Sequence, residues 1–165
     1  MVLSTQIVRV ADGLPLAASM DDEEHSNGKE LAEPKNLLRQ LYKKLNNSVD
    51  QRCSIDTGNF IFHYYIEYGV CFLAICDKQY PKKLAFQFLE ELQKEFNEKY
   101  GSEVGSVARP YAFVKFDTFI QKTKKQYKDT RTTKNLNKLH EDLRDVTGIM
   151  TMNIRDALVR GETLD

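Results

Sequence analysis

The chain has 165 residues, of which 41% are hydrophobic and 29% charged, a composition typical of folded globular proteins and not of disordered ones. Lysine plus arginine balance aspartate plus glutamate at 24 each, so the overall charge indicates neither nucleic acid nor another acidic polymer as a partner. The length allows one domain with a sizeable core and a shorter appendage.

The cysteines and apolar runs indicate a soluble chain in a reducing compartment. The longest apolar run, residues 68–76, is far too short to span a bilayer, and Arg9 and Asp12 interrupt the only candidate secretory signal. The cysteines lie in strand-like runs without metal-ligand spacing, so we expect buried free thiols, as in the cytosol. They are Cys53, Cys71 and Cys76.

The N-terminal third predicts a β-hairpin followed by a helix. Residues 2–10 are rich in β-formers and Asp12 with Gly13 is a strong turn signal, so residues 14–20 should form the returning strand. Pro15 restricts that strand to a sheet edge or places the proline at its start. A polar loop then leads to a helix, whose apolar face is formed by Leu31, Leu37, Leu38, Leu41 and Leu45.

Three strands joined by short turns should follow, over residues 52–57, 59–67 and 70–77. The first alternates polar and apolar side chains, as a half-buried outer strand does. The third is apolar on both faces and is therefore predicted to be central. These connections make the predicted sheet antiparallel.

Two more helices complete the folded part. One begins after Pro81, and the other should run over residues 111–128. The apolar face of the first contains Leu84, Ala85, Phe88, Leu89, Leu92 and Phe96, and that of the second contains Phe113, Phe116, Ile120 and Tyr127. The order of elements predicts an α+β fold in which an antiparallel sheet is packed between helices.

The last 30 residues carry a heptad seam, that is, a series of positions separated alternately by three and four residues. Such spacing is typical of a coiled coil, although it also fits a helix that packs only on its own domain. Arg160 needs acceptors from partner helices, or solvent, because a buried unpaired guanidinium is very costly. Gly148 and Gly161 weaken an isolated helix, so we expect the segment to order only when it docks. The seam consists of Leu136, Leu139, Leu143, Val146, Met150, Asn153, Ala157, Arg160 and Leu164.

Nothing in the sequence indicates an enzyme or a cofactor. The histidines are His25, His63 and His140, and none lies in a pattern typical of a triad or metal site. His63 is better explained as a packed strand histidine than as a catalytic base. Gly101 and Gly105 do not form a phosphate-binding loop, because no strand precedes them and no lysine and hydroxyl pair follows.

A basic run begins late in the last predicted helix of the folded part. It consists of Lys122, Lys124, Lys125, Lys128, Arg131 and Lys134, with Asp129 as its internal counter-charge. A solvated helix end with cations at its C-terminus is the ordinary explanation. Attraction to anionic membrane headgroups is the functional alternative, and nucleic acid fits poorly because aromatic side chains are not interleaved.

Several motifs along nearly the whole chain resemble the longin-type R-SNAREs, and within them the vesicle SNAREs that shuttle between the endoplasmic reticulum and the Golgi. They include residues 9–15 in the first hairpin, Phe62, His63 and Tyr64 in a strand, residues 81–86 at a helix start, Arg109, Pro110, Tyr111 with residues 116–124, and, in the tail, Val146, Met150, Asn153 and Ile154 followed by Leu158, Val159, Arg160 and Gly161. The last four resemble the R-SNARE signature.

This resemblance implies a longin, or profilin-like, domain with a five-stranded antiparallel sheet over residues 1–128. A linker would follow at residues 129–135, and residues 136–165 would be the N-terminal half of an R-SNARE motif. It also implies that Arg160 is the central-layer residue of a four-helix bundle, where it meets glutamines from three Q-SNARE helices.

The resemblance further implies that the C-terminal segment can fold back onto the longin domain and that a coat of the COPII type reads this closed form. The docking residues would be Met150, Asn153 and Ile154, and the groove would be lined by Leu37, Leu41, Leu45, Cys53 and Ile55. The expected location is the cytosolic face of endoplasmic reticulum, intermediate compartment and Golgi membranes.

Two departures from the family pattern qualify these expectations. The chain ends at Asp165, before the second half of the SNARE motif and the C-terminal membrane anchor of the family, so we expect a shortened soluble fragment. Arg155 stands where close relatives carry an acidic residue. The alternative function is a longin-like regulatory module that binds a coat or a small GTPase, with the tail serving only as an internal brace.

Overall fold

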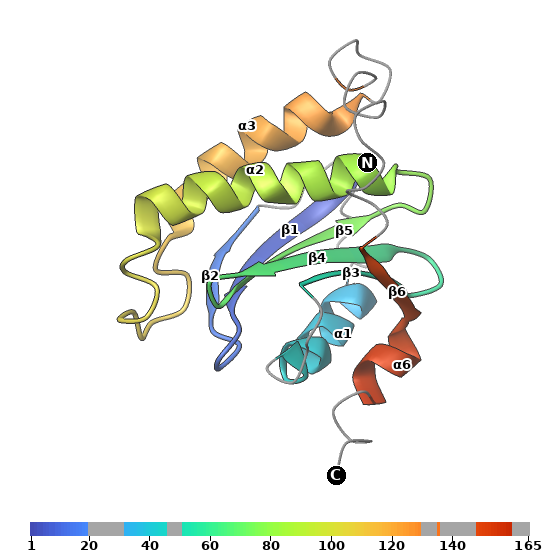
Figure 1. Ribbon diagram of the computed structural model, residues 1–165, viewed down its shortest axis with the longest axis horizontal. Helices are drawn as coiled ribbons and strands as arrows, with labels where there is room; N and C mark the ends of the chain where they lie inside the picture. Colours follow the sequence, from blue (N-terminus) through green and yellow to red (C-terminus); the bar gives the residue numbers. More distant parts are fainter. Residues whose placement is uncertain (20–31, 46–50, 130–134, 136–147, 160–165) are drawn as a thin grey trace.

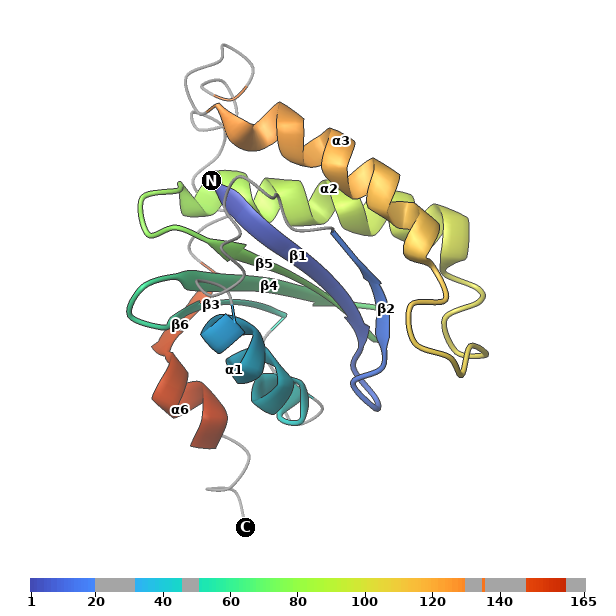
Figure 2. The same cartoon turned by 180° about the vertical axis from the view of Figure 1, so that it is seen from behind.

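The computed structural model describes residues 1–19, 32–45, 51–129, 135 and 148–159. It contains one six-stranded sheet in the order β2-β1-β5-β4-β3-β6. Helices α2 and α3 cover one face of this sheet, while α1 and α6 lie on the other (Figures 1 and 2). The predicted α+β arrangement of a sheet between helices is therefore confirmed.

The first hairpin forms one edge of the sheet. Strand β1 (Val2–Arg9) pairs antiparallel with β2 (Pro15–Ala18), and Gly13 in the connection has a φ of 71°, which glycine adopts without steric cost. Pro15 is the first residue of an edge strand, as predicted. The backbone N–H groups of Tyr111 and Phe113 donate to the carbonyls of Pro15 and Leu16 over 2.8 and 3.0 Å, so this edge is covered.

The centre of the sheet is β5 (Val70–Cys76), which pairs antiparallel with β1 and with β4 (Ile61–Glu67). All seven residues of β5 are buried because helices cover both of its faces. Phe72 points into the core beneath α2, whereas Leu73 belongs to the core beneath α1. The central position predicted for this doubly apolar strand is confirmed.

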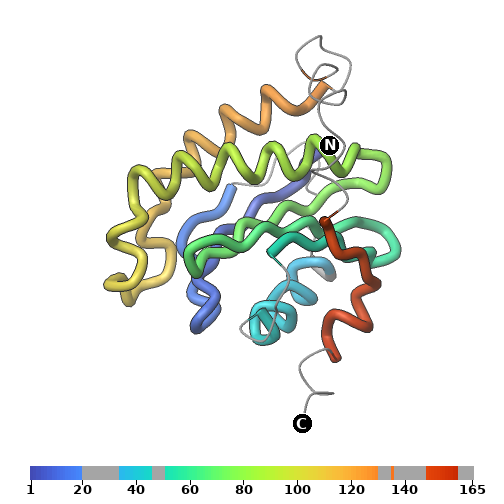
Figure 3. The backbone as a smooth tube through the Cα atoms, viewed as in Figure 1, coloured from blue at the N-terminus to red at the C-terminus, as the bar shows by residue number. Residues whose placement is uncertain are grey.

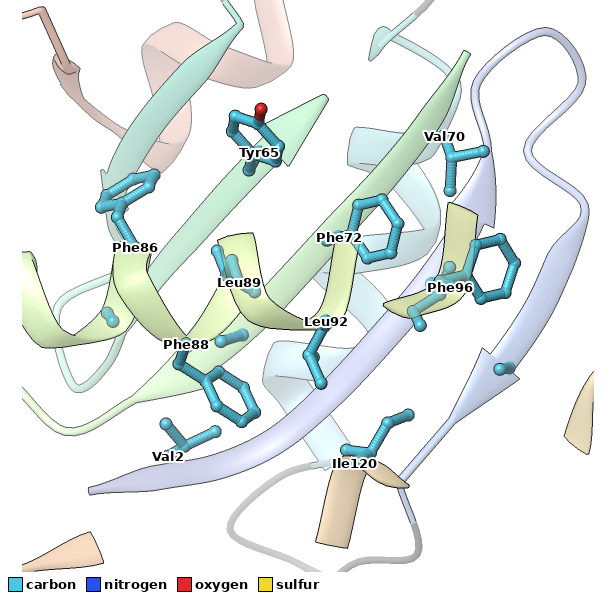
Figure 4. Close-up of a cluster of buried hydrophobic side chains, with 14 of the residues drawn as sticks. Val2, Tyr65, Val70, Phe72, Phe86, Phe88, Leu89, Leu92, Phe96 and Ile120 are labelled. Carbon is cyan, nitrogen blue, oxygen red and sulfur yellow. The ribbon is translucent and has the colours of Figure 1, made fainter. Parts of the chain in front are cut away.

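Helix α2 (Lys82–Tyr100) supplies most of the larger core. Figure 4 shows Leu89, Leu92 and Phe96 among side chains from the sheet and Ile120 of α3 (Asp117–Lys128). The Phe96 ring makes edge contacts with neighbouring rings, a preferred geometry of aromatic pairs. These rings belong to Phe72, Phe113 and Phe116.

The helix predicted over residues 111–128 begins later than expected. Tyr111 has a φ of 57°, which lies outside the right-handed helical region. Its segment contacts the β2 edge, and a short 3₁₀ helix, η2 (Val114–Phe116), precedes α3. Pairing with the sheet therefore overrides helical periodicity at residues 111–113.

The C-terminal segment differs most from the prediction. Residues Met150–Asn153 form strand β6, which pairs in parallel with β3 (Arg52–Asp56). The sheet thus has six strands and one parallel pair, not five antiparallel strands. Helix α6 (Ile154–Val159) follows and lies beside α1 (Ala32–Tyr42), and Figure 3 traces this path.

The heptad seam is typical of a helix, but residues 150–153 form a strand in this structure. The physical reason is the edge of β3, whose backbone N–H and C=O groups form hydrogen bonds with residues 150–153. A single isolated helix turn provides fewer hydrogen bonds than this pairing. The rest of the seam, namely Leu136, Leu139, Leu143, Val146, Arg160 and Leu164, lies outside the described residues.

Candidate docking site for the C-terminal segment

The site begins at the outer edge of β3, which has β4 on its other side. The parallel ladder pairs Cys53 with Met150, Ile55 with Met152 and Asp56 with Asn153. These backbone hydrogen bonds satisfy the groups that an edge strand would otherwise leave to solvent. Backbone pairing therefore fixes the register of the segment, even though most side chains of β6 are exposed.

Apolar contacts continue the site from the strand onto α1. Ala157 of α6 is 3% exposed and lies in the core cluster beneath α1. Met152, Ile154 and Leu158 are partly buried against the same cluster. Its buried members include Leu41, Leu45, Cys53 and Ile55, and Leu37 is packed against it. The residues expected to line the groove thus belong to one cluster with Ala157.

The segment also crosses the edge of the sheet. Ile149, immediately before β6, is 9% exposed and belongs to the opposite core, the one beneath α2. Ala157 is buried on the α1 side. Side chains on either side of β6 therefore pack into the cores on both faces of the sheet.

Two polar contacts add to this attachment. Lys82 Nζ, from the first turn of α2, donates to Thr151 Oγ1 over 3.0 Å. The backbone N–H of Asp156 donates to Asn153 Oδ1 over 2.8 Å, so Asn153 acts as the N-cap of α6. Thr151 and Asn153 thereby link the strand to α2 and to its own following helix.

A buried polar pair lies next to the site, on strands β3 and β4. Ser54 Oγ and His63 Nδ1 are 2.7 Å apart across the β3–β4 ladder, and the His63 ring meets Phe86 of α2 edge to face. Burial, followed by the charge of Lys82, lowers the pKa of His63 to about 3. The ring is therefore neutral at physiological pH, and its 1% exposure confirms the prediction of a packed strand histidine.

The three expected docking residues contribute unequally. Met150 is 42% exposed, Asn153 is exposed and acts through its cap, and Ile154 is half-buried. The sequence interpretation missed Ile149, Met152 and Leu158. A signal exists only for Met152, because Met150, Met152 and Ile154 alternate with Thr151, Asn153 and Arg155, which is the period of a strand. The heptad spacing of the same stretch masked this alternation.

The described part of the chain contains no group of histidine, cysteine and carboxylate side chains that could hold a metal ion. The three cysteines are buried free thiols, as predicted. Among the described helices, none is both long and apolar enough to cross a membrane.

Comparisons with known proteins agree with this architecture. A family model described as Longin, a regulated-SNARE-like domain, matches residues 16–120. Vesicle-trafficking protein SEC22b of Xenopus tropicalis is 51% identical over 164 residues, covering 99% of this chain and 76% of the frog protein. The 25.3 kDa vesicle transport protein SEC22-1 of Arabidopsis thaliana is 49% identical. Protein transport protein sec22 of Schizosaccharomyces pombe is 48% identical. Each match covers 100% of this chain and 76% of the relative. The chain therefore belongs to the SEC22 family of longin-domain vesicle-trafficking proteins.

Proposed function

We propose that this protein is an R-SNARE that acts in vesicle docking and membrane fusion between the endoplasmic reticulum and the Golgi, and that its longin domain holds the SNARE segment in a closed form. The observation that carries the closed form is the parallel pairing of Met150–Asn153 with β3. The family relationship supports the transport role.

The closed form and the SNARE bundle compete for the same residues. Met150, Asn153 and Ala157 occupy heptad positions that would face partner helices in a bundle. Here two of them lie in a strand and the third is buried against the longin domain. One segment cannot adopt both arrangements at once, so partners that bind the helical form shift the population away from the closed form.

The proposed boundaries rest on the end of α3 at Lys128 and on the start of the heptad seam at Leu136. Residues 1–128 form the longin domain, residues 129–135 a linker and residues 136–165 the first half of the SNARE motif. Asn135, the last residue of the proposed linker, is attached to the end of α3, because its Nδ2 donates to the carbonyls of Gln126 and Asp129 over 3.0 and 2.7 Å.

The proposed partners are three Q-SNARE helices, with Arg160 meeting their glutamines in the central layer. A coat of the COPII type would recognise the closed form on the cytosolic face of the endoplasmic reticulum, intermediate compartment and Golgi membranes. Arg155 and Asp156 are exposed on the docked segment itself, so the surface available to such a coat here includes a cation directly after Ile154.

A matched pair of substitutions tests the competition. Met152→Asp places a charge in the half-buried contact with the α1 core, whereas Val159→Asp places the same charge at a side chain that is 42% exposed. Neither residue belongs to the heptad seam. Because burying an unpaired carboxylate is costly, Met152→Asp should raise amide exchange over residues 148–159 by about tenfold or more, and speed assembly with three glutamine-bearing SNARE helices.

The Val159→Asp protein should exchange and assemble like the unmodified chain. If Met152→Asp exposes the segment but assembly is neither faster nor more extensive, the closed form does not restrain assembly. If the three helices bind neither protein, the segment is a brace and the protein is a longin-type binding module for a coat or a small GTPase.

A further inference from the structure

Helix α3 presents a row of unneutralised lysines to solvent. Lys122, Lys125 and Lys128 are exposed and separated by three residues each, so they lie along one side of the helix. In the described part of the chain, no carboxylate forms an ion pair with any of the three. Asp117 and Asp129 lie at the two ends of the row, which leaves its middle cationic.

The row borders a small pocket between α3 and the start of β1. The pocket has a volume of about 90 Å³ and is lined by Met1, Val2, Gln121, Lys124, Lys125 and Lys128. Its lining includes the apolar side chains of Met1 and Val2, and Val2 is buried in the core. Lys124 is only 8% exposed and its Nζ donates to the carbonyl of Leu3 over 3.4 Å. The N-terminal ammonium forms an ion pair with Asp77.

We propose that this α3 basic face, made of Lys122, Lys125 and Lys128 with the adjoining pocket, binds the anionic headgroups of a phospholipid membrane. Lysine at a charged membrane surface attracts headgroups without requiring a fixed geometry, and the pocket is large enough for a phosphate group beside the ammonium groups of Lys125 and Lys128. The sequence supports the same charge, since Arg131 and Lys134 follow the helix.

A membrane fits this face better than a nucleic acid. Single-stranded nucleic acid binding depends on aromatic platforms for the bases, whereas Tyr127 of α3 is buried and Phe119 stacks on Phe116. The described part of α3 therefore presents no exposed aromatic ring between its lysines. The lysine stems instead contribute apolar surface around charged tips, as at membrane interfaces.

The basic face is separate from the docking site of the C-terminal segment. Helix α3 lies with α2 on one face of the sheet, while α6 lies with α1 on the other (Figure 1). The N-terminus lies beside the C-terminal end of α3 in both views (Figures 1 and 2). A membrane on this side leaves β6 and α6 accessible.

Vesicle co-sedimentation tests the proposal with two matched double variants. Lys125→Glu/Lys128→Glu reverses two charges on α3, and Arg39→Glu/Lys43→Glu reverses two exposed charges on or just after α1, on the opposite face. The net charge of the two proteins is identical. Since each cation near an anionic surface contributes about a fivefold gain in binding, the α3 variant should bind phosphatidylserine-containing vesicles at least about 20-fold more weakly than the unmodified protein.

The α1 variant should bind these vesicles like the unmodified protein, and phosphatidylcholine vesicles should bind none of the three. Binding should weaken as salt is added.

Equal losses in both variants, or binding that is independent of phosphatidylserine, would overturn the proposal. Displacement by inorganic phosphate at constant ionic strength would assign the pocket to a free anion, and equally tight binding of an oligonucleotide would assign the face to nucleic acid. Far-UV circular dichroism identifies a variant that is misfolded, and Lys125→Gln/Lys128→Gln then replaces it.

Discussion

His63 shows how a single buried side chain couples this fold to pH. Its Nδ1 is paired with Ser54, but its Nε2 is buried without a hydrogen-bond partner in the described structure. Protonation would place a charge between β4 and α2, beside the cation of Lys82. The folded protein therefore holds the ring neutral, while the unfolded chain does not.

The pH dependence of stability follows from this difference. The pKa of His63 is lowered from 6.5 to about 3 in the folded state, so below about pH 6.5 the unfolded state binds a proton that the folded state does not. Stability should therefore fall as the pH falls, by about 2 kcal/mol between about pH 7.5 and about pH 5. Urea denaturation at a series of pH values measures this slope.

The matched variant is His63→Gln, which keeps an acceptor for the Ser54 hydroxyl and removes the titrating group. It should be less stable at neutral pH, yet its stability should change less over the same interval. The carboxylates with lowered pKa, Asp12 and Asp56, act at lower pH and do not interfere. Identical slopes for the two proteins would show that His63 is not the responsible group.

At the scale of the element, Asn153 connects strand and helix. Its side chain caps α6 by accepting the N–H of Asp156, and a cap of this kind contributes about 1 kcal/mol. Asn153→Ala should therefore raise amide exchange over residues 154–159 by about fivefold while exchange in β5 stays unchanged. Hydrogen exchange with mass spectrometry resolves the two segments.

The control for this prediction is Asn153→Ser. Serine keeps an oxygen acceptor for the N–H of Asp156 and, unlike aspartate, adds no charge opposite Asp56. Protection over residues 154–159 should be retained. If alanine and serine loosen α6 equally, the side chain does not act as a cap, and its register opposite Asp56 is the feature that matters.

Local periodicity was sufficient to predict the elements whose burial is set by their own sequence. Phe72 and Leu73 lie on opposite faces of β5, and a strand apolar on both faces has only a central place in a sheet covered by helices. Helix α2 was predicted for the same reason, since its apolar residues repeat at helical spacing and Pro81 precedes it.

The features that the sequence did not predict depend on distant partners. Tyr111 leaves the helix because its N–H pairs with β2, and Met150–Asn153 form a strand because β3 offers an edge. The spacing of Met150, Asn153 and Ala157 fits a heptad equally well. A pattern compatible with two structures suits the proposed exchange between the closed form and a bundle, and only the tertiary contact selects one.

At the scale of the molecule, the sheet separates two surfaces with different proposed tasks. The α1 face and the β3 edge hold the C-terminal segment, and the α3 basic face lies on the other side of the sheet, in the layer formed by α2 and α3. The central strand β5 is buried throughout between these surfaces. A close-packed core of this kind transmits little movement unless it has two discrete arrangements.

Opening the closed form should therefore leave membrane binding unchanged. Changes at distant sites without shared partners usually combine additively, and no residue of the docking site lines the α3 pocket. The Met152→Asp protein should bind phosphatidylserine vesicles within about twofold of the unmodified protein, and adding Lys125→Glu/Lys128→Glu should lower the binding of both by the same factor. Vesicle co-sedimentation of the four proteins completes a double-mutant cycle. A loss of vesicle binding on Met152→Asp alone would show that membrane contact and closure are one coupled transition, in which the membrane itself would favour the closed form.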